Sequence, residues 1–437
     1  MTIRTELAGS TSPGDRFGNP LSPGLAYARG EILTSGEREF RKLEVAQEHI
    51  RRRLNDGGVD SVFNVSGLER GMQPQAGDTY NDELSPAIYG ERLRELGLAH
   101  LGGTAEYHDV FVCNRQSAAL FAALMVMVSR GSQVVGLSRT YSHPAVSRPI
   151  ALLGAEFVDT TDLPSFERLI AQATKPSVAV VTRLPVSYDG VLAIDDLEKA
   201  VAVCQLNGVP ILVDDAGGAR VAPAVWGQPR LLELGVDVGT TGLDKYGTVG
   251  PRLGLLGGRK DLVAAIRAVA FEYGLEARPM LYPAVVQSLE QYTEERVRDL
   301  TTATSSLGEA LHARLGDAVT LTPVAVKIEA EDLLAVVLAR AELAATPIVP
   351  YEITAAIAMV LLREYGILTV HFAGLPPGTA ALLFKFVPPE VLDRLGGAPK
   401  VAGYVDAAID QVAEMLHTPA SIKELLLGTV VAYTGAS

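Results

Sequence analysis

Short apolar runs alternate with longer amphipathic stretches between residues 109 and 259, and this alternation constrains the fold most strongly. Short uninterrupted apolar runs are typical of strands buried on both faces. The intervening stretches have helical periodicity, and two of them end at Gly131 and Gly208. The predicted strands are 109–114, 133–137, 155–160, 177–182, 210–215 and 236–241. We therefore expect an α/β fold with a mostly parallel, seven-stranded-type sheet and helices on both of its faces.

The flanking regions differ in composition. The first thirty residues are rich in Gly, Pro and Ser and predict a loose arm, and residues 35–54 predict an amphipathic helix with Ser35 as N-cap. Residues 57–110 are loop-rich, and a long helical region is expected over 283–315, followed by a smaller α+β part. The predicted organisation is an arm and helix (1–59), a large domain (60–283), and an interdomain helix with a small C-terminal domain (284–437).

Composition excludes several classes of function. The chain has 437 residues, of which 48% are hydrophobic, and a net charge of −13, whereas nucleic-acid binding calls for a basic surface. No apolar run is long enough to span a membrane, and the N-terminus lacks the apolar core of a signal peptide. Cys113 and Cys204 occur singly in apolar runs, as buried thiols of a reducing compartment do. The seven histidines lack metal-ligand spacing. We expect a cytoplasmic protein with no nucleic-acid or membrane partner and no metal.

Polar residues follow the predicted strands, in the segments "NRQSAA", "SRTYSHP", "RLPVSYDG", "DDAGGAR" and "TTGLDKYG". In parallel sheets, ligands bind beyond the carboxyl ends of the strands. The last segment carries Lys245 between an apolar run and a glycine-rich stretch. A buried lysine is costly unless it is paired or covalently occupied. Lys245 is therefore either a surface-turn lysine or a reactive group held in a pocket.

The pair "VDDAGGARVAP" and "LELGVDVGTTGLDKYGTVGPRLGLLGGRKDL" resembles fold-type I pyridoxal-phosphate (PLP) enzymes, the aspartate-aminotransferase-like superfamily. Within it, the chain looks most like the selenocysteine-synthase-like branch, over roughly residues 60 to 390. The resemblance implies pyridoxal 5'-phosphate as cofactor, a small-molecule amino acid substrate, and a homodimer or a dimer of dimers.

The resemblance implies which residues bind the aldehyde and the ring nitrogen of the cofactor. Lys245 would form the imine with PLP, and burial would keep its amine neutral enough to react. Asp214, followed by Ala216 in the Asp-x-Ala pattern, would keep the ring nitrogen protonated; the alternative is that it caps the strand end. Asp215 would point the other way and pair with Arg220 or help hold the lysine loop.

The phosphate would lie at the helix start in "NRQSAA", on the backbone N–H groups of Gln116 and Ser117, the Ser117 hydroxyl and Arg115. Ser117 is alternatively an ordinary N-cap. Relatives often carry Ser or Thr three residues before the lysine, where this chain has Gly242, so Thr241 is expected to replace that contact.

His143 in "TYSHPAV" matches the ring that stacks on the PLP face in many relatives, and it is also a candidate for proton transfer. Tyr141 is the rival for this position, and the alternative for His143 is that it caps the next helix.

Substrate carboxylates usually meet an arginine. Relatives often carry one in the C-terminal domain, where this chain offers Lys385 in "ALLFKFVPP". Arg183, Arg220 and Arg252 are the other candidates. Tyr80, in the loop-rich segment, is expected to reach the substrate site of a partner subunit.

The branch favours β-elimination or β-replacement through a Cα carbanion, on a small amino acid or an amino sugar acid. An aminotransferase or a retro-aldol lyase is the alternative reaction. An alternative from another class of function is a protein with the PLP fold that binds the cofactor or a partner without catalysing a reaction.

Overall fold

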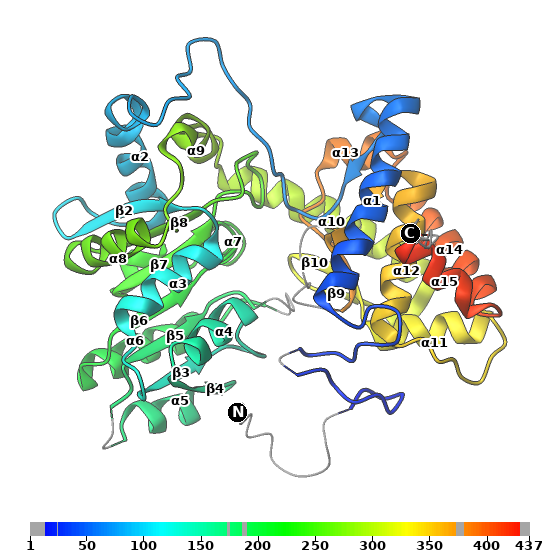
Figure 1. Cartoon of the computed structure of the whole chain (residues 1–437), viewed down its shortest axis with the longest axis horizontal. Coiled ribbons are helices and arrows are strands. Elements are labelled where there is room, and N and C mark those ends of the chain that lie inside the picture. The colour runs from blue at the N-terminus through cyan, green and yellow to red at the C-terminus, as the bar shows by residue number, and fades with distance from the viewer. Residues whose placement is uncertain (1–13, 24, 173–174, 186–189, 373–379, 429–437) are drawn as a thin grey trace, which may run out of the picture. The chain divides into compact units, whose positions relative to one another are not determined.

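The computed structural model describes residues 14–23, 25–172, 175–185, 190–372 and 380–428, and these residues form two compact units. Unit 1 comprises residues 68–298, and unit 2 comprises residues 14–67 with 299–428. Figure 1 labels their elements. The division differs from the three predicted parts, because helix α1 (Gly36–Gly57) packs against α12 (Pro350–Tyr365) and α15 (Pro419–Leu427) within unit 2. Among the described residues, no helix is long and apolar enough to cross a bilayer.

Unit 1 is built on a seven-stranded sheet with the order β2-β8-β7-β6-β5-β3-β4. Its strands are β2 (His108–Cys113), β3 (Gln133–Leu137), β4 (Glu156–Thr160), β5 (Val178–Thr182), β6 (Ile211–Asp214), β7 (Val238–Gly242) and β8 (Gly254–Arg259). Only β8 runs antiparallel to its neighbours β2 and β7 in this sheet. The predicted α/β class and mostly parallel sheet are confirmed.

Successive side chains of a strand point to opposite faces of the sheet, and apolar side chains cover both faces. Val110 and Val112 belong to one apolar cluster, which packs with α2 (Ser85–Leu101), α5 (Leu163–Ile170), α6 (Ile194–Asn207) and α9 (Tyr282–Glu290). Phe111 belongs to a second cluster, which packs with α3 (Gln116–Met127), α4 (Pro144–Leu152) and α8 (Lys260–Glu272). Helices therefore cover both faces of the sheet, as Figure 1 shows for unit 1. The remaining helix of this layer, α7 (Gly218–Trp226), follows β6.

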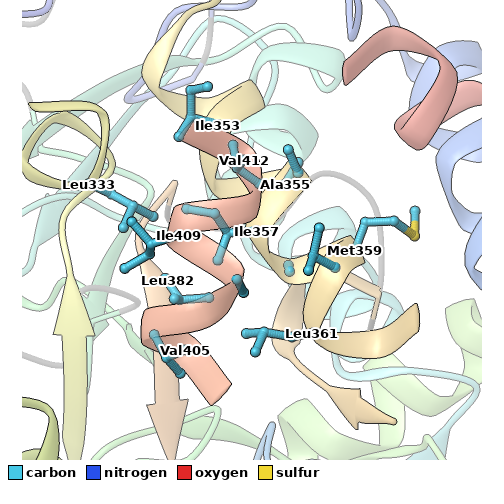
Figure 2. Close-up of a cluster of buried hydrophobic side chains, with 14 of the residues drawn as sticks. Leu333, Ile353, Ala355, Ile357, Met359, Leu361, Leu382, Val405, Ile409 and Val412 are labelled. Atoms are coloured by element: carbon cyan, nitrogen blue, oxygen red, sulfur yellow. The ribbon is translucent and has the colours of Figure 1, made fainter. Parts of the chain in front are cut away.

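Unit 2 combines a small antiparallel sheet with helices. The sheet order is β12-β10-β9, from β9 (Val319–Leu321), β10 (Ala325–Ile328) and β12 (Leu382–Lys385), and β1 (Phe63–Asn64) pairs separately with β11 (Ile367–Leu368). Its helices besides α1, α12 and α15 are α11 (Ala330–Arg340), α13 (Pro389–Arg394) and α14 (Ala398–Met415). The long helix α10 (Glu294–Leu315) spans the boundary of the two units. Figure 2 shows the apolar contacts between α12 and α14 that form the core of unit 2.

Two sequence predictions about the N-terminal third need correction. The loop-rich segment 57–110 contains the 17-residue helix α2. The predicted loose arm is partly buried: Tyr27 and Ala28 are buried, and just beyond it the backbone N–H groups of Ile32 and Leu33 each donate to Glu352 Oε1 at 2.8 Å. In a solvent-exposed arm, water would accept hydrogen bonds from these N–H groups. Here the carboxylate of Glu352 accepts them instead. Residues 1–13 of the arm lie outside the described residues.

Candidate active site

The carboxyl ends of β6 and β7 bring Asp214 and Lys245 together. Asp214 is the last residue of β6, and Lys245 lies three residues beyond the end of β7, which is the neighbouring strand in the sheet. Asp214 is 3% exposed and Lys245 is partly buried. Lys245 is therefore not the solvent-directed turn lysine of the alternative interpretation.

Gln116, the first residue of α3, joins these two residues through its side chain. The Lys245 Nζ donates to Gln116 Oε1 at 3.0 Å, and Gln116 Nε2 donates to Asp214 Oδ1 at 2.6 Å. The amide has one acceptor and one donor end, so it serves both charged groups at once. The sequence had suggested Gln116 only for its backbone N–H, so this side-chain link is new.

Burial shifts the protonation of both charged groups. Desolvation lowers the pKa of Lys245, against the opposing charges of Asp244 and Asp214. Desolvation also raises the pKa of Asp214 to about 6, although the charge of Lys245 acts in the opposite direction. A lysine with a lowered pKa supplies more neutral amine at neutral pH, which is the form that reacts with a carbonyl.

The turn that carries Lys245 has a constrained backbone. Tyr246 has φ +50° and Gly247 has φ +94°, so two consecutive residues occupy the left-handed region. A Cβ placed on Gly242 would lie 2.9 Å from Lys245 Cε, because the lysine side chain folds back over this glycine. Backbone strain of this kind clusters at functional sites.

Asp215 faces away from the lysine turn and pairs with Arg183. Arg183 Nη1 lies 3.4 Å from Asp215 Oδ2, and both side chains are fully buried. Arg183 also donates to Gln228 Oε1 at 3.1 Å and to the carbonyl of Pro229 at 2.6 Å. The expected Asp215–Arg220 pair is therefore replaced by Asp215–Arg183. These contacts occupy the guanidinium of Arg183, so we leave it out of the substrate-binding set.

Arg220 contacts the lysine turn itself. Its Nη1 donates to the Lys245 carbonyl and, at 2.6 Å, to Thr248 Oγ1. Arg220 is fully buried in α7. It lies beneath the turn and is not exposed to a substrate from solvent.

The N-terminus of α3 is the candidate phosphate site. Arg115 is its N-cap residue, and neither Arg115 nor Ser117 caps the helix with its side chain, so the N-cap alternative for Ser117 does not hold. Ser117 is exposed at the second helical position. A Cβ on Gly254 would lie 2.7 Å from the Gln116 nitrogen, so the glycine lets β8 and the helix start approach closely. The exposed N–H groups of such a helix start attract anions.

Arg252 lies near this helix start. Burial and the charges of Arg70 and Arg115 lower the pKa of Arg252 to about 10, so its guanidinium is close to both. Arg252 therefore lies within electrostatic reach of Arg115, the N-cap residue of α3, whereas the sequence had suggested it for the substrate. Like charges gathered at one helix start favour a multiply charged anion.

Three threonines lie around Asp214. Thr182 and Thr240 are its register partners on β5 and β7, and among the described residues their buried hydroxyls have no hydrogen-bond partner. Thr241 points to the other face of β7, and its hydroxyl donates to the carbonyl of Ala216 at 3.4 Å. The Thr241 hydroxyl has one proton to donate, so a phosphate contact as predicted would have to replace its hydrogen bond to the Ala216 carbonyl.

His143 follows β3 and begins α4. Its Nδ1 accepts from the backbone N–H of Ala145 at 2.9 Å, so it is the N-cap of the helix, as the alternative interpretation held. The preceding loop is fixed by Ser142, whose N–H and hydroxyl both donate to Asp159. Burial, followed by the charge of Lys245, lowers the pKa of His143 to about 4. The ring is therefore neutral at neutral pH and lies within electrostatic reach of Lys245, a relation that fits the stacking position.

The two remaining candidates make their own contacts within their respective units. Lys385 is the last residue of β12 in unit 2, where it pairs with Ala325 and is 5% exposed. Tyr80 donates to Asp78 Oδ2 at 3.1 Å, and Asp78 also accepts from Gln287 Nε2 at 2.8 Å. Tyr80 is therefore anchored to α9 of its own unit.

Sequence reasoning missed the charged residues that hold the lysine turn from the loop-rich segment. Arg70 Nε donates to Asp244 Oδ2 at 2.7 Å, and the N–H of Gly247 donates to Glu69 Oε2 at 3.2 Å. Asp244 is adjacent to Lys245 in the sequence, and that charged pair inside an apolar run was the available signal. Its distant partners carry no local pattern.

Comparison with known proteins gives the family. The model of the aminotransferase class I and II family matches residues 77–380. The chain belongs to this family. A "UPF0425 pyridoxal phosphate-dependent protein" of Methanothermobacter thermautotrophicus is 30% identical over 91% of this chain and 100% of its own length. The L-seryl-tRNA(Sec) selenium transferase of Serratia proteamaculans is 26% identical over 53% of this chain and 56% of its own length.

Solved structures agree on the fold. The ureidoglycine-glyoxylate aminotransferase of Bacillus subtilis has a TM-score of 0.53 at 13% identity, covering 82% of this chain and 97% of its own. The alanine–glyoxylate aminotransferase of Nostoc sp. has a TM-score of 0.55 at 15% identity, covering 80% of this chain and 95% of its own. The chain is a fold-type I PLP enzyme, and its cofactor is pyridoxal phosphate.

The residues present fit this cofactor. A helix start that no side chain caps suits its phosphate, the buried Asp214 suits its ring nitrogen, and Lys245 suits its aldehyde. The unpartnered hydroxyls of Thr182 and Thr240 flank Asp214, where a polar ring atom would enter. Among the described residues, no cluster of three metal-ligating side chains is present. Cys113 and Cys204 are buried, and burial raises both thiol pKa values to about 12, which keeps them unreactive.

Proposed function

We propose that this enzyme uses Lys245-bound PLP for β-elimination or β-replacement on a small amino acid or an amino sugar acid. The observation that carries the proposal is the chain of contacts from Lys245 through Gln116 to Asp214. When bound, PLP supplies a ring that accepts the electron pair released at the substrate Cα. The chain's own residues bind it, orient it and move the proton.

Lys245 has two successive tasks in this proposal. Its amine would hold the cofactor in the resting enzyme and, when not bonded to the cofactor, would serve as the base for the substrate. The lowered pKa then leaves the amine neutral beside the substrate, where it can take the Cα proton. Gln116 Oε1, now 3.0 Å from Nζ, receives a hydrogen bond from the amine and limits its motion.

Asp214 holds a proton on the cofactor ring nitrogen. Its pKa of about 6 leaves it ionised above that pH, and a cationic ring nitrogen would lower this pKa further. Gln116 Nε2 fixes the carboxylate on one oxygen at 2.6 Å. The backbone N–H of Ala216 also donates to this carboxylate.

The helix start and Arg252 would hold the phosphate, and His143 would stack on the ring. Gln116 and Ser117 contribute N–H groups, and Arg252 and Arg115 contribute charge. His143 Nδ1 is already an acceptor and its pKa is about 4, so the ring is a weak base. We therefore assign stacking to His143 and proton removal to Lys245.

Two observations favour loss or replacement of a β-substituent. Lys385 stands where the family resemblance implies an arginine for the α-carboxylate of ordinary amino acids. The Serratia relative is named as a selenium transferase acting on a seryl group. The net charge of −13 favours a small substrate over tRNA. The aminotransferase alternative rests on the names of the family and of the structural neighbours.

The experiment is a product assay of the PLP-loaded enzyme on amino acids with β-leaving groups, such as serine, cysteine, O-phosphoserine and 2-amino sugar acids. Elimination releases equal amounts of ammonia and a 2-keto acid without any added keto acid, because water replaces the amine after the leaving group has gone. An aminotransferase requires a 2-keto acid acceptor and releases no ammonia. A retro-aldol lyase gives glycine and an aldehyde. Either of these results, or binding without turnover, contradicts the proposed reaction.

A further inference from the structure

Arg220 is a buried cation that feels the charges of Asp244 and Glu69 without forming an ion pair with either. Its side chain is fully buried in α7, and among the described residues no carboxylate lies within ion-pair distance of it. Burying a charged group costs several kcal/mol unless it is paired or fully hydrogen-bonded. Its Nη2 is also buried without a hydrogen-bond partner among the described residues. An arginine with no specific role would have a lower free energy at the protein surface, so the contacts that Arg220 makes need an explanation.

Those contacts bracket the lysine turn. Arg220 Nη1 donates both to the carbonyl of Lys245 and to Thr248 Oγ1. The two residues between them are Tyr246 and Gly247, which have positive φ values. One nitrogen atom thus ties the first and last residues of the strained turn together. For a bulky residue such as Tyr246, this conformation is strained and needs such support.

His100, from α2, orients the guanidinium from the other side. Arg220 Nε donates to His100 Nε2 at 3.4 Å, which requires an unprotonated Nε2. Burial and the charges of Arg220 and Arg230 hold the pKa of His100 well below its usual range. The ring of Tyr292 packs edge-on against His100 at 4.9 Å, and its hydroxyl donates to the Arg220 carbonyl at 2.9 Å.

We propose that Arg220 is a positioning residue for Lys245: with neutral His100 behind it, it locks the Lys245–Thr248 turn so that the lysine amine points at Gln116. The proposal rests on the proposed role of Lys245. It gives a purpose to the buried charge, because a cation beneath the turn also disfavours a second cation on Lys245. The charge of Arg220 is accordingly among the causes that lower the pKa of Lys245.

The test uses cofactor-free protein, so it does not depend on catalysis. The pH dependence of Lys245 acetylation is followed by peptide mass spectrometry, and amide hydrogen exchange is followed over residues 245–249. For Arg220→Met, we expect the acetylation midpoint to rise by about one pH unit and the amides to exchange about tenfold faster. Arg220→Lys keeps a charge and should restore most of the midpoint but little of the exchange protection, because it lacks the Nε–H group that donates to His100 and orients the side chain.

Tyr292→Phe is the matched control. It removes the hydrogen bond to the Arg220 backbone but keeps the ring against His100, so midpoint and exchange should stay as in the parent protein. If Arg220→Met does not fold, His100→Leu serves instead, because it removes the acceptor and leaves the guanidinium in place. Unchanged midpoints and exchange in the folded variants would overturn the proposal, as would equal effects of Tyr292→Phe.

The outcomes remain separable from the proposed function. If the parent protein fails to attach PLP at Lys245, the proposed function is wrong whatever Arg220 does. If PLP attaches and Arg220→Met changes neither readout, only the positioning role is wrong.

Discussion

The ammonium of Lys245 donates to Gln116 Oε1 at 3.0 Å, which places the lysine one side chain away from Asp214. Lys245 comes from the turn after β7 and Gln116 from the first turn of α3, 129 residues earlier in the sequence. The link therefore couples the start of α3 to the protonation of both Lys245 and Asp214.

Replacing Gln116 should weaken cofactor binding through Asp214. Gln116→Met leaves the Asp214 carboxylate without its 2.6 Å donor, which raises its pKa further and reduces its charge near neutral pH. We expect PLP affinity to fall by about 10- to 100-fold, which corresponds to about 1.4–2.8 kcal/mol, and to recover in part at higher pH. Titration of PLP absorbance at several pH values measures this. Ser117→Ala, at the next helical position, should lower affinity without changing its pH dependence; a shared pH dependence would refute the coupling.

Asp214→Asn should stabilise the cofactor-free protein while destroying cofactor binding. The pKa of Asp214 is raised from 3.8 to about 6, so the folded chain holds a proton that the unfolded chain has lost in that interval. The free energy of unfolding of the parent protein therefore falls as the pH rises from about 4 to about 6, and it stays at the lower value above pH 6. The two-unit shift corresponds to at most about 3 kcal/mol. Thermal unfolding of both proteins should coincide at pH 4 and separate at pH 8, with the variant higher. A variant that is less stable at pH 8 would contradict this.

Gly254 should tolerate no side chain. A Cβ there would meet the Gln116 backbone nitrogen and the Arg115 carbonyl, both at 2.7 Å, and backbone atoms cannot move away as a flexible side chain can. We expect Gly254→Ala to cost about 1–3 kcal/mol and to lower PLP affinity by displacing the helix start. Chemical unfolding and PLP titration measure the two effects. Gly90→Ala is the control, because nothing lies within 4 Å of its Cβ position in helix α2; it should leave binding unchanged.

Arg252 should act on the phosphate of the cofactor. If it helps to hold that group, Arg252→Met weakens PLP by about tenfold or more but leaves the affinity for pyridoxal, which lacks the phosphate, nearly unchanged. Parallel titrations with both compounds separate this role from the substrate role first expected. An equal loss for both compounds, or a loss confined to substrate, would place Arg252 elsewhere.

Much of unit 1 could be predicted from sequence because its strands are buried on both faces. The run 133–137 is entirely apolar apart from Gln133 and matches β3. Helix α2 was missed because Pro86, Gly90 and Gly97 interrupt its pattern, and its register is set by packing against α9. The buried arm near Leu33 was missed because it depends on Glu352, more than 300 residues away.

Some features of the candidate site could likewise be predicted from the sequence, and others could not. The proximity of Asp214 and Lys245 follows from strand order, which the alternating pattern predicts. The partner of Asp215 could not be predicted, because Arg183 and Arg220 are both near strand ends and only side-chain packing distinguishes them. Gln116 was chosen for its backbone, and its side-chain link depends on a rotamer that no local pattern encodes.

The central claim is that Lys245 carries the cofactor, and borohydride reduction of the PLP-loaded protein tests it most directly. Reduction fixes a lysine-bound cofactor permanently, and peptide mass spectrometry then identifies the lysine. The account predicts the label on Lys245 and the loss of both label and visible absorption in Lys245→Ala. A label on another lysine, or none with PLP in excess, would contradict it.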